Sequence, residues 1–337
     1  MSPRHRIRTG DHGVRPVLVL GTPCTGTAEM ARAVNLLGAS LGQPGSVGKF
    51  SENKELRRIN QALLDVLGGD WDCPPVMHQG WTRGPATQVV TPARARAAVL
   101  AEFGDAPVGV WKDLRACLTL PFWLPVFDES PVVIFVHRHP VEVAEALHNA
   151  RGFGRAHALA IWERCNHDAL MHAAGLPTFA IDHQTLVEDP AGVAKRMVAA
   201  LDGWDVRFDR ELDGTDLELA PRDRFHRAPD LARFDDPVAT AEQRELFRIL
   251  QDVEGASGCF ALPERLPGPN PISLELLALA GRVRVARHDT IATELAFDQT
   301  AGSRRRLVRT FLERTLPDRV LPRVESAASR PRRSTVD

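Results

Sequence analysis

The hydrophobic positions of this chain fall into short continuous runs separated by segments of helical periodicity. Four runs are apolar or nearly so and are bounded by polar residues, glycine or proline: 17–20, 108–111, 132–136 and 178–181. Strands that are covered on both faces show such runs, because neither face alternates with solvent. We expect these four segments to form a buried, mainly parallel sheet.

Between the runs, apolar residues recur at spacings of three and four, which is typical of helices packed on one side. This pattern predicts helices over 30–37, 51–67, 92–103, 118–127, 155–174, 240–253 and 273–287, and after Pro140 and Pro190. Ser51 is the expected N-cap of the second helix. The segment 68–85 reads as irregular, and we expect no strand beyond about residue 205.

Alternation of strands and helices predicts an α/β fold in three layers, with a central sheet flanked by helices and a mostly helical C-terminal extension. We expect four segments. Residues 1–15 form a flexible arm, 16–230 the α/β domain, 231–325 the helical extension and 326–337 a disordered basic tail.

Composition narrows the class of protein. The 337 residues are 44% hydrophobic and 25% charged, which excludes a disordered, collagen-like or coiled-coil chain. Lys and Arg number 42 against 43 Asp and Glu, for a net charge of −1. This balance gives no support to a nucleic-acid partner. An arginine-rich C-terminus leaves open an interaction of the tail with an anionic surface, with a solvated tail as the alternative.

Cysteine spacing and hydropathy indicate in which cellular compartment the protein is expected. The five cysteines form no Cys-x-x-Cys pair, which indicates reduced thiols and neither a disulfide framework nor a zinc site: Cys24, Cys73, Cys117, Cys165 and Cys259. No apolar run approaches the length of a membrane helix, and the run after the basic N-terminus is too short for a signal peptide. We therefore expect a cytoplasmic protein without a membrane span.

A glycine-bounded loop follows the first predicted strand. Strand 17–20 runs into Gly21-x-x-x-x-Gly26 and then a helix, the arrangement in which backbone N–H groups bind phosphate. A nucleoside-triphosphatase loop would continue with Lys and then Ser or Thr, whereas here Thr27 and Ala28 follow. ATP γ-phosphate transfer is therefore disfavoured. The alternative is an ordinary turn between a strand and a helix.

A second loop places an arginine at the carboxyl end of strand 132–136, in His137-Arg138-His139-Pro140. Ligands bind at this edge of open parallel sheets, and the guanidinium of arginine grips phosphate through two nitrogens. The alternative is a surface arginine before a helix. His137 and His139 lack a third ligand at a telling spacing, so we expect no metal site.

Taken together, these two loops resemble the P-loop-fold sulfotransferase family, in particular its bacterial branch, which uses 3′-phosphoadenosine 5′-phosphosulfate (PAPS). The resemblance covers about residues 16–230 and rests on ordered motifs. Besides the two loops, these motifs are 52–55, 111–115, 120–123, 182–190 and 224–227.

The resemblance implies a three-layer P-loop-type fold and transfer of a sulfuryl group from PAPS to a hydroxyl or amine of a small-molecule or carbohydrate acceptor, without a metal. It assigns the co-substrate to Thr22, Pro23, Cys24, Thr25, Gly26, Thr27, Ala28, Arg138, Ala146 and Arg227. Arg224 is the alternative to Arg227 at the 3′-phosphate, and both are alternatively solvated charges. We expect the two loops to converge at one rim of the sheet, with the guanidinium of Arg138 available to the 3′-phosphate.

Two positions depart from the family pattern. Cys24 stands where the first loop usually carries Lys or Arg, and Ala146 where the second site usually carries Ser. Leu114 stands in place of the histidine base of the cytosolic branch. These departures support an alternative, a catalytically silent nucleotide-binding or scaffold relative. A phosphotransferase on the same architecture is a third, less favoured hypothesis.

Two residues are candidates for catalysis. Glu52 is the candidate base, and the alternative is a carboxylate that only stabilises the N-terminus of its helix. Lys112 is the candidate cation in place of the one lost at Cys24, and the alternative is an ion-pair partner of Asp113 or Glu52. The sequence specifies neither the acceptor, whose pocket we expect in loops 42–50 and 71–91, nor the oligomeric state.

Overall fold

The computed structural model describes residues 14–44, 52–104, 106–208, 210 and 234–301, with side chains as far as residue 286. The chain divides into two compact units, Met1–Arg282 and Val283–Asp337. The described residues of the second unit, 283–301, continue helix α11 (Pro271–Ala301). Ser51, Arg224, Arg227, most of the predicted N-terminal arm and the predicted basic tail lie outside the described residues.

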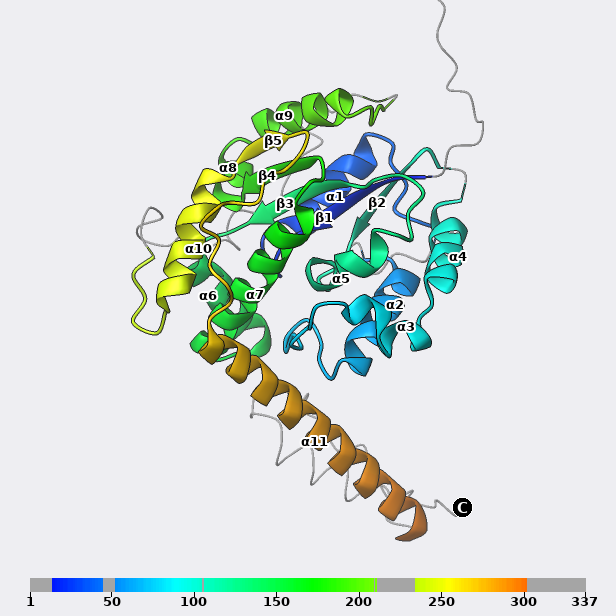
Figure 1. Cartoon of the computed structure of the whole chain (residues 1–337), viewed down its shortest axis with the longest axis vertical. Coiled ribbons are helices and arrows are strands. Elements are labelled where there is room, and N and C mark those ends of the chain that lie inside the picture. The colour runs from blue at the N-terminus through cyan, green and yellow to red at the C-terminus, as the bar shows by residue number, and fades with distance from the viewer. Residues whose placement is uncertain (1–13, 45–51, 105, 209, 211–233, 302–337) are drawn as a thin grey trace, which may run out of the picture. The chain divides into compact units, whose positions relative to one another are not determined.

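A five-stranded sheet in the order β2-β1-β3-β4-β5 forms the centre of the first unit (Figure 1). Its strands are β1 (Arg15–Leu20), β2 (Val108–Lys112), β3 (Val132–His137), β4 (Thr178–Asp182) and β5 (Gly255–Ser257). The first four pair in parallel, and β5 pairs antiparallel to β4. The mainly parallel α/β sheet that the apolar runs predicted is therefore confirmed.

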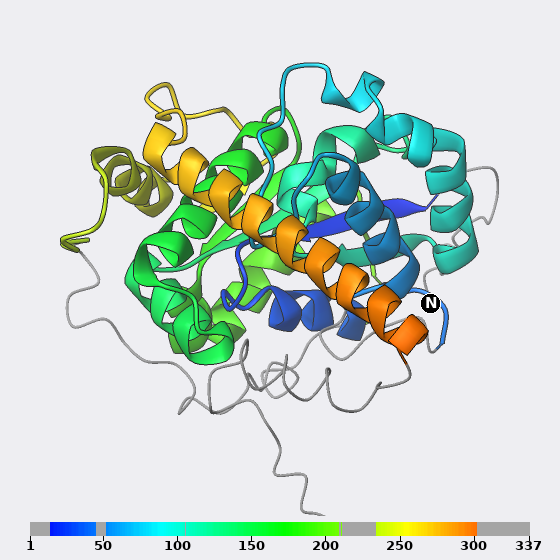
Figure 2. The ribbon, with the colours of Figure 1, turned by 90° about the horizontal axis from the view of Figure 1, so that it is seen from below.

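Helices cover both faces of this sheet (Figures 1 and 2). Along β1, Leu18 and Leu20 join the core beneath α2 (Lys54–Val66), α5 (Ala116–Trp123) and α7 (Arg155–Ala173). Val17 and Val19 join the core beneath α1 (Thr27–Leu36) and α9 (Pro190–Gly203). All four side chains are at most 1% exposed. Burial on both faces explains why the strand reads as a continuous apolar run.

The helices of the first unit follow the predicted order. They are α1 (Thr27–Leu36), α2 (Lys54–Val66), η1 (Trp81–Arg83), α3 (Ala86–Val89), α4 (Pro92–Phe103), α5 (Ala116–Trp123), α6 (Pro140–Arg151), α7 (Arg155–Ala173), α8 (His183–Glu188), α9 (Pro190–Gly203), α10 (Ala241–Asp252) and the start of α11. The short elements η1, α3 and α8 carry no apolar periodicity of their own, and the sequence pattern did not predict them.

The expectation of no strand beyond residue 205 is wrong, because Gly255–Ser257 pairs with β4 through Ala256 and Phe179. Its side chains are partly or fully exposed. An edge strand of this kind is held by backbone hydrogen bonds alone, so it needs no apolar run for a sequence pattern to detect.

The expected N-cap of α2 is also wrong. Asn53, and not Ser51, caps this helix, because its Oδ1 accepts hydrogen bonds from the backbone N–H groups of Glu55 and Leu56, both at 3.0 Å. The side-chain amide of Asn53 also donates to Glu102 on α4 at 2.8 Å. Ser and Asn cap helices equally well, and this contact with α4 favours the later position.

In the part of the chain that the structure describes, no helix is both long and apolar enough to cross a membrane. All five cysteines are free thiols.

The packing of α2 on α5 depends on a buried hydrogen-bond network around Asn60. Its amide donates to Asp113 at 2.9 Å, and its carbonyl accepts from Thr119 at 2.8 Å and from the indole of Trp123 at 2.7 Å. Replacing Asn60→Leu leaves the buried indole N–H of Trp123 without its partner and removes one hydrogen bond each from Asp113 and Thr119. We expect a loss of about 3 kcal/mol in unfolding free energy, measured by urea denaturation.

A matched control on the same helix is Arg58→Ala, whose side chain is 71% exposed. It is expected to change the unfolding free energy by less than about 0.5 kcal/mol. Equal effects of the two substitutions would contradict the structural role of the Asn60 network.

Candidate functional site

The strand order reverses at one point of the sheet. The chain passes from β1 to β2 on one side and then to β3 on the other side of β1, so the loops after β1 and β3 diverge at their carboxyl ends. In open parallel sheets, ligands bind outside the carboxyl ends of the strands at such a reversal of strand order. The loop 21–26 and the loop at Arg138 are the two loops that flank this point.

Three residues with positive φ shape the first loop. Gly21 has a φ of 154°, and a Cβ there would lie 2.4 Å from the carbonyl oxygen of Val136. Gly26 has a φ of 93° and caps α1, and Cys24 has a φ of 67°. The glycine spacing noted in the sequence therefore has a backbone cause, since a side chain at Gly21 would push β1 away from β3.

The same loop carries hydrogen-bond donors that the protein does not use. Within the described chain, the backbone N–H groups of Thr25, Gly26, Thr27 and Ala28 donate to no other group. The Thr25 hydroxyl donates to the carbonyl of Thr22 at 2.7 Å, and the buried Thr22 hydroxyl has no partner. Unpaired N–H groups at the start of a ten-residue helix are suited to an anion.

Arg138 links the second loop to the first. Its Nη1 donates to the carbonyl oxygen of Cys24 at 2.8 Å. Its Nε donates to Glu142, four residues along at the start of α6, also at 2.8 Å. The structure thus brings the two loops together at one rim, as expected from the sequence. Contrary to the expectation, the guanidinium is only 4% exposed and already has a carboxylate partner.

Lys112 and Glu52 form an ion pair next to the first loop. Lys112 ends β2 and lies beside Val19 of β1, and its Nζ is 3.0 Å from Oε1 of Glu52. Both side chains are largely buried, at 6% and 12% exposure. Of the alternatives for Lys112, the partner observed is Glu52, whereas Asp113 bonds to Asn60 and Arg115. Among the residues that the structure describes, Glu52 is the one hydrogen-bond partner of Lys112, so two of the three N–H donors are left for a ligand.

The electrostatics at Cys24 bring in a cation that the sequence analysis did not identify. Desolvation raises the pKa of the Cys24 thiol, and the charges of Arg138, Lys112 and Arg151 oppose this shift. Arg151 is the last residue of α6, with its guanidinium carbon 5.8 Å from the ring centroid of Trp71. The loop tip therefore lies in the field of three cations. No motif marks Arg151, since only the fold brings the end of α6 to the first loop.

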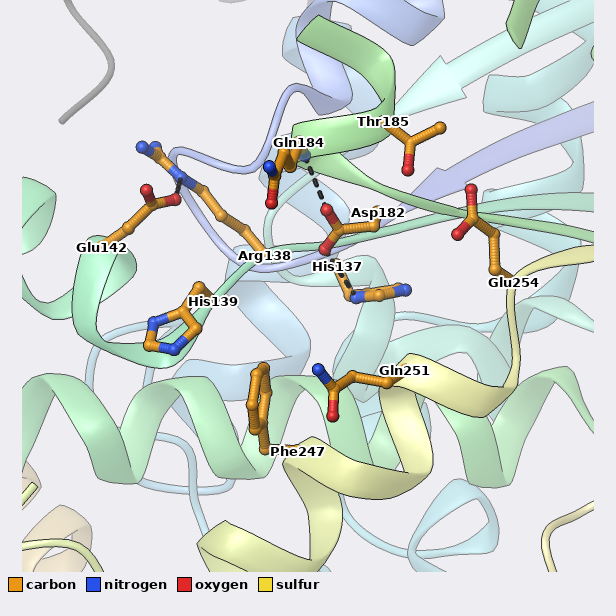
Figure 3. Close-up of a pocket in the computed structure, with 10 residues that line it drawn as sticks. All are labelled: His137, Arg138, His139, Glu142, Asp182, Gln184, Thr185, Phe247, Gln251 and Glu254. Atoms are coloured by element: carbon orange, nitrogen blue, oxygen red, sulfur yellow. Dashed lines mark hydrogen bonds and ion pairs between the residues drawn. The ribbon is translucent and has the colours of Figure 1, made fainter. Parts of the chain in front are cut away.

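A cavity of about 210 Å³ opens beside Arg138 (Figure 3). His137 at the end of β3 and Asp182 at the end of β4 face each other across it, with Nδ1 and Oδ2 3.4 Å apart. Burial lowers the pKa of His137 to about 4, partly opposed by the charge of Glu254. The imidazole is therefore neutral, and its buried Nε2 has no hydrogen-bond partner.

The side chains that line this cavity determine which ligand groups it can bind. With a proton on Nδ1 directed at Asp182, Nε2 of His137 is an acceptor. Figure 3 shows this end of the ring pointing toward Glu254, away from Arg138. Three carboxylates line the cavity, those of Glu142, Asp182 and Glu254. The cavity itself is thus suited to an N–H or O–H donor, and the anion-binding groups lie in the first loop.

The other residues that the sequence assigned to the co-substrate lie at several different places in the structure. Pro23 is buried and Cys24 is exposed in the turn of the first loop, and Ala146 lies partly buried on α6, two turns after Arg138. Arg227 lies outside the described residues. Among the residues that the structure describes, no group of three or more His, Cys, Asp or Glu is arranged to hold a metal ion.

Three solved structures are similar to this chain over most of its length. The sulfotransferase domain of the Synechococcus PCC 7002 olefin synthase shares 17% identity over 81% of this chain and 97% of its own, with a TM-score of 0.36. Sulfotransferase STF1 from Mycobacterium tuberculosis H37Rv shares 16% identity over 63% of this chain and 76% of its own, with a TM-score of 0.38.

The third is the sulfotransferase domain of the curacin biosynthetic pathway, with 12% identity over 82% of this chain and 99% of its own, and a TM-score of 0.35. No family model and no curated protein matches the chain. The three structures are described as sulfotransferases, the family that the sequence motifs resemble.

The buried histidines predict sensitivity to acid. Burial lowers the pKa of His137 to about 4, whereas an unfolded histidine titrates near 6.5. Between these pH values the unfolded state binds a proton that the folded state does not. The contribution of His137 to unfolding free energy is therefore complete above pH 6.5 and falls by about 1.4 kcal/mol per pH unit toward pH 4.

Urea denaturation at several pH values measures this slope. His137→Asn, which keeps an N–H toward Asp182, is expected to reduce the slope between pH 6 and 4.5 relative to the unmodified chain. The exposed His78, replaced by Asn, serves as the control and should leave it unchanged. An unchanged slope in the His137 variant would show that this imidazole is protonated in the folded state.

Proposed function

We propose that this protein is a PAPS-dependent sulfotransferase that transfers a sulfuryl group to a hydroxyl or amine of a small-molecule or carbohydrate acceptor. The observation that carries the proposal is the meeting of two loops at the reversal of strand order, where Arg138 bonds to the carbonyl of Cys24 at 2.8 Å. The Lys112–Glu52 pair lies at the end of the neighbouring strand.

Several features of the chain suit PAPS. The unpaired N–H groups from Thr25 to Ala28 and the partnerless Thr22 hydroxyl would bind the 5′-phosphosulfate. Arg138, shared with Glu142, would bind the 3′-phosphate. An adenine amino group is a donor of the kind that Nε2 of His137 can accept. The motifs that resemble the sulfotransferase family supply the identity of the co-substrate.

In this mechanism, PAPS supplies the sulfuryl group and departs as 3′,5′-adenosine diphosphate. The acceptor oxygen or nitrogen forms a bond to sulfur while the bond from sulfur to the phosphate oxygen breaks. Glu52 accepts the proton of the acceptor, and Lys112 orients Glu52 through their 3.0 Å contact. The remaining N–H donors of Lys112 stabilise the charge that develops on the phosphate oxygen, a task that Cys24 cannot perform.

A catalytically silent nucleotide-binding relative is the second candidate. A specific observation favours it, because each of the two buried cations at the rim has a carboxylate partner within 3.0 Å. Neutralised cations stabilise a leaving phosphate less than unpaired ones do. The two candidates share the nucleotide site and differ in whether sulfate is transferred.

Lys112→Ala separates these candidates. If the protein is a sulfotransferase, this substitution is expected to lower the transfer rate by about 10²- to 10³-fold. Transfer of labelled sulfate from PAPS to a panel of hydroxyl and amine acceptors is the measurement, and Lys195→Ala on the exposed face of α9 is the control.

Thermal stabilisation by 3′,5′-adenosine diphosphate tests the shared site. Stabilisation without any transfer would favour the silent relative. Absence of stabilisation at millimolar nucleotide would remove both candidates.

The pairing of Arg138 with Glu142 predicts an unusual effect on affinity. Glu142→Gln keeps the size of the side chain and removes the charge that competes with a phosphate. We expect 3′,5′-adenosine diphosphate to bind several-fold more tightly to this variant, by about 1 kcal/mol, in isothermal titration calorimetry. Glu145→Gln on the same helix is the matched control. Weaker binding in the Glu142 variant would mean that Glu142 positions Arg138 for the ligand.

A further inference from the structure

A second cavity, of about 360 Å³, lies between α7, α5 and the segment 77–82 that leads into η1. It shares no lining residue with the cavity beside Arg138, and neither the first loop nor Lys112 contributes to it. Four of its lining residues are apolar: Met77, Trp81, Pro121 and Met171. Helix α7 contributes the polar residues Arg164, His167, Asp168 and His172.

The polar side of this cavity is one face of a buried helix. Arg164, His167, Asp168, Met171 and His172 follow each other at spacings of three, one, three and one, which places them on a single stripe of α7. Most other residues of this helix are buried apolar side chains. A titratable stripe on a helix that is otherwise largely buried requires an explanation, because buried charges are costly unless they serve packing partners or a ligand.

Arg164 provides the first part of that explanation. Its Nε donates to Oδ2 of Asp168 at 2.8 Å, and both side chains are 8% exposed. The terminal nitrogens Nη1 and Nη2 make no hydrogen bond to the residues that the structure describes, yet they are not closed off from solvent. This edge of the guanidinium is therefore left for an occupant of the cavity that Arg164 lines.

Both carboxylate oxygens of Asp168 already accept a hydrogen bond. Its Oδ1 bonds to Nδ1 of His167 at 3.0 Å, and Oδ2 is used by Arg164. The hydrogen bond from His167 and the charge of Arg164 outweigh burial and hold the pKa of Asp168 below its usual value. Asp168 is thus an anion that fixes the orientation of the Arg164 guanidinium and of the His167 imidazole.

The histidines are oriented in the same way. Nδ1 of His172 is 2.8 Å from the carbonyl oxygen of Cys117, which can only accept, so this nitrogen carries the proton. Burial lowers the pKa of His172, and the charges of Arg164 and His167 add to this shift while the charge of Asp168 opposes it, so the four groups form one cluster. The guanidinium edge is consequently the fixed cationic donor that faces the cavity.

We propose that this cavity is a binding site for a small carboxylic acid with an apolar, ring-sized body, separate from the nucleotide site. A planar carboxylate matches the two parallel N–H donors of the Nη1–Nη2 edge. The apolar body packs against Met77, Trp81 and Met171, of which Met171 is 42% exposed in the ligand-free chain. The site requires no nucleotide, so it does not depend on the proposed sulfuryl transfer.

The probe for this site is 3-phenylpropionate, with 3-phenylpropionamide as the ligand control that lacks the charge. Isothermal titration calorimetry on the full chain is expected to give a dissociation constant in the millimolar range or below for the acid. The amide should bind at least about tenfold more weakly, since only the carboxylate can pair with both terminal nitrogens.

Arg164→Lys is the informative variant, because it keeps a cation for Asp168 and therefore the fold, but removes the two-nitrogen edge. It should weaken binding of the acid about tenfold or more and leave the thermal midpoint nearly unchanged. The exposed Arg94, replaced by Lys, is the matched control and should change neither. Trp81→Ala, outside the ion pair, should also weaken binding of the acid.

The proposal would be overturned by no binding of the acid to the folded chain at millimolar concentration, by equal affinities for acid and amide, or by unchanged affinity in a folded Arg164→Lys variant. Binding of inorganic phosphate in preference to the acid would also overturn it, because phosphate makes no use of the apolar walls. None of these outcomes depends on whether 3′,5′-adenosine diphosphate binds at the other site.

Discussion

The site depends on the close parallel pairing of β1 with β3. Because the backbone of Gly21 approaches the carbonyl of Val136 so closely that a Cβ would lie 2.4 Å from it, the loops after these strands leave the sheet side by side. The hydrogen bond from Arg138 to Cys24 then links the two loops at 2.8 Å. Without this close pairing, the unpaired N–H groups of the first loop would not lie next to a buried arginine.

A second constraint is that buried cations in this protein are accompanied by carboxylates. Lys112 pairs with Glu52, Arg138 with Glu142 and Arg164 with Asp168, all within 3.0 Å. Arg115 contacts Asp70 at the same distance. A cation removed from water needs such a partner, since its desolvation otherwise outweighs any structural gain. An anionic ligand at either proposed site must therefore share its cation with a resident carboxylate.

Much of the fold could be predicted from local pattern, and the failures have physical causes. The runs at β1 and β3 were detectable because both faces of each strand are buried, whereas β5 is held by backbone pairing and leaves no trace in its Gly-Ala-Ser side chains. The N-cap of α2 was misplaced because Ser51 and Asn53 have similar intrinsic preference, and the contact of Asn53 with Glu102 lies 49 residues away. For the site, the two loops were found from glycine and arginine at strand ends. Arg151 was not found, because nothing in its neighbourhood marks it.

By itself, the sequence determined the α/β class, the positions of the four main strands along the chain, and the two loops that follow strands at the sheet edge. These properties follow from hydrophobic periodicity and from residues whose backbone or side-chain chemistry acts locally. Only the tertiary structure decided which charges meet: that Lys112 pairs with Glu52, that Arg138 is buried against Glu142, and that one stripe of α7 faces a cavity. The pairing of Lys112 with Glu52 joins distant parts of the chain. Arg138 and Glu142 are only four residues apart, but the burial of their pair depends on the surrounding fold, which no single segment specifies.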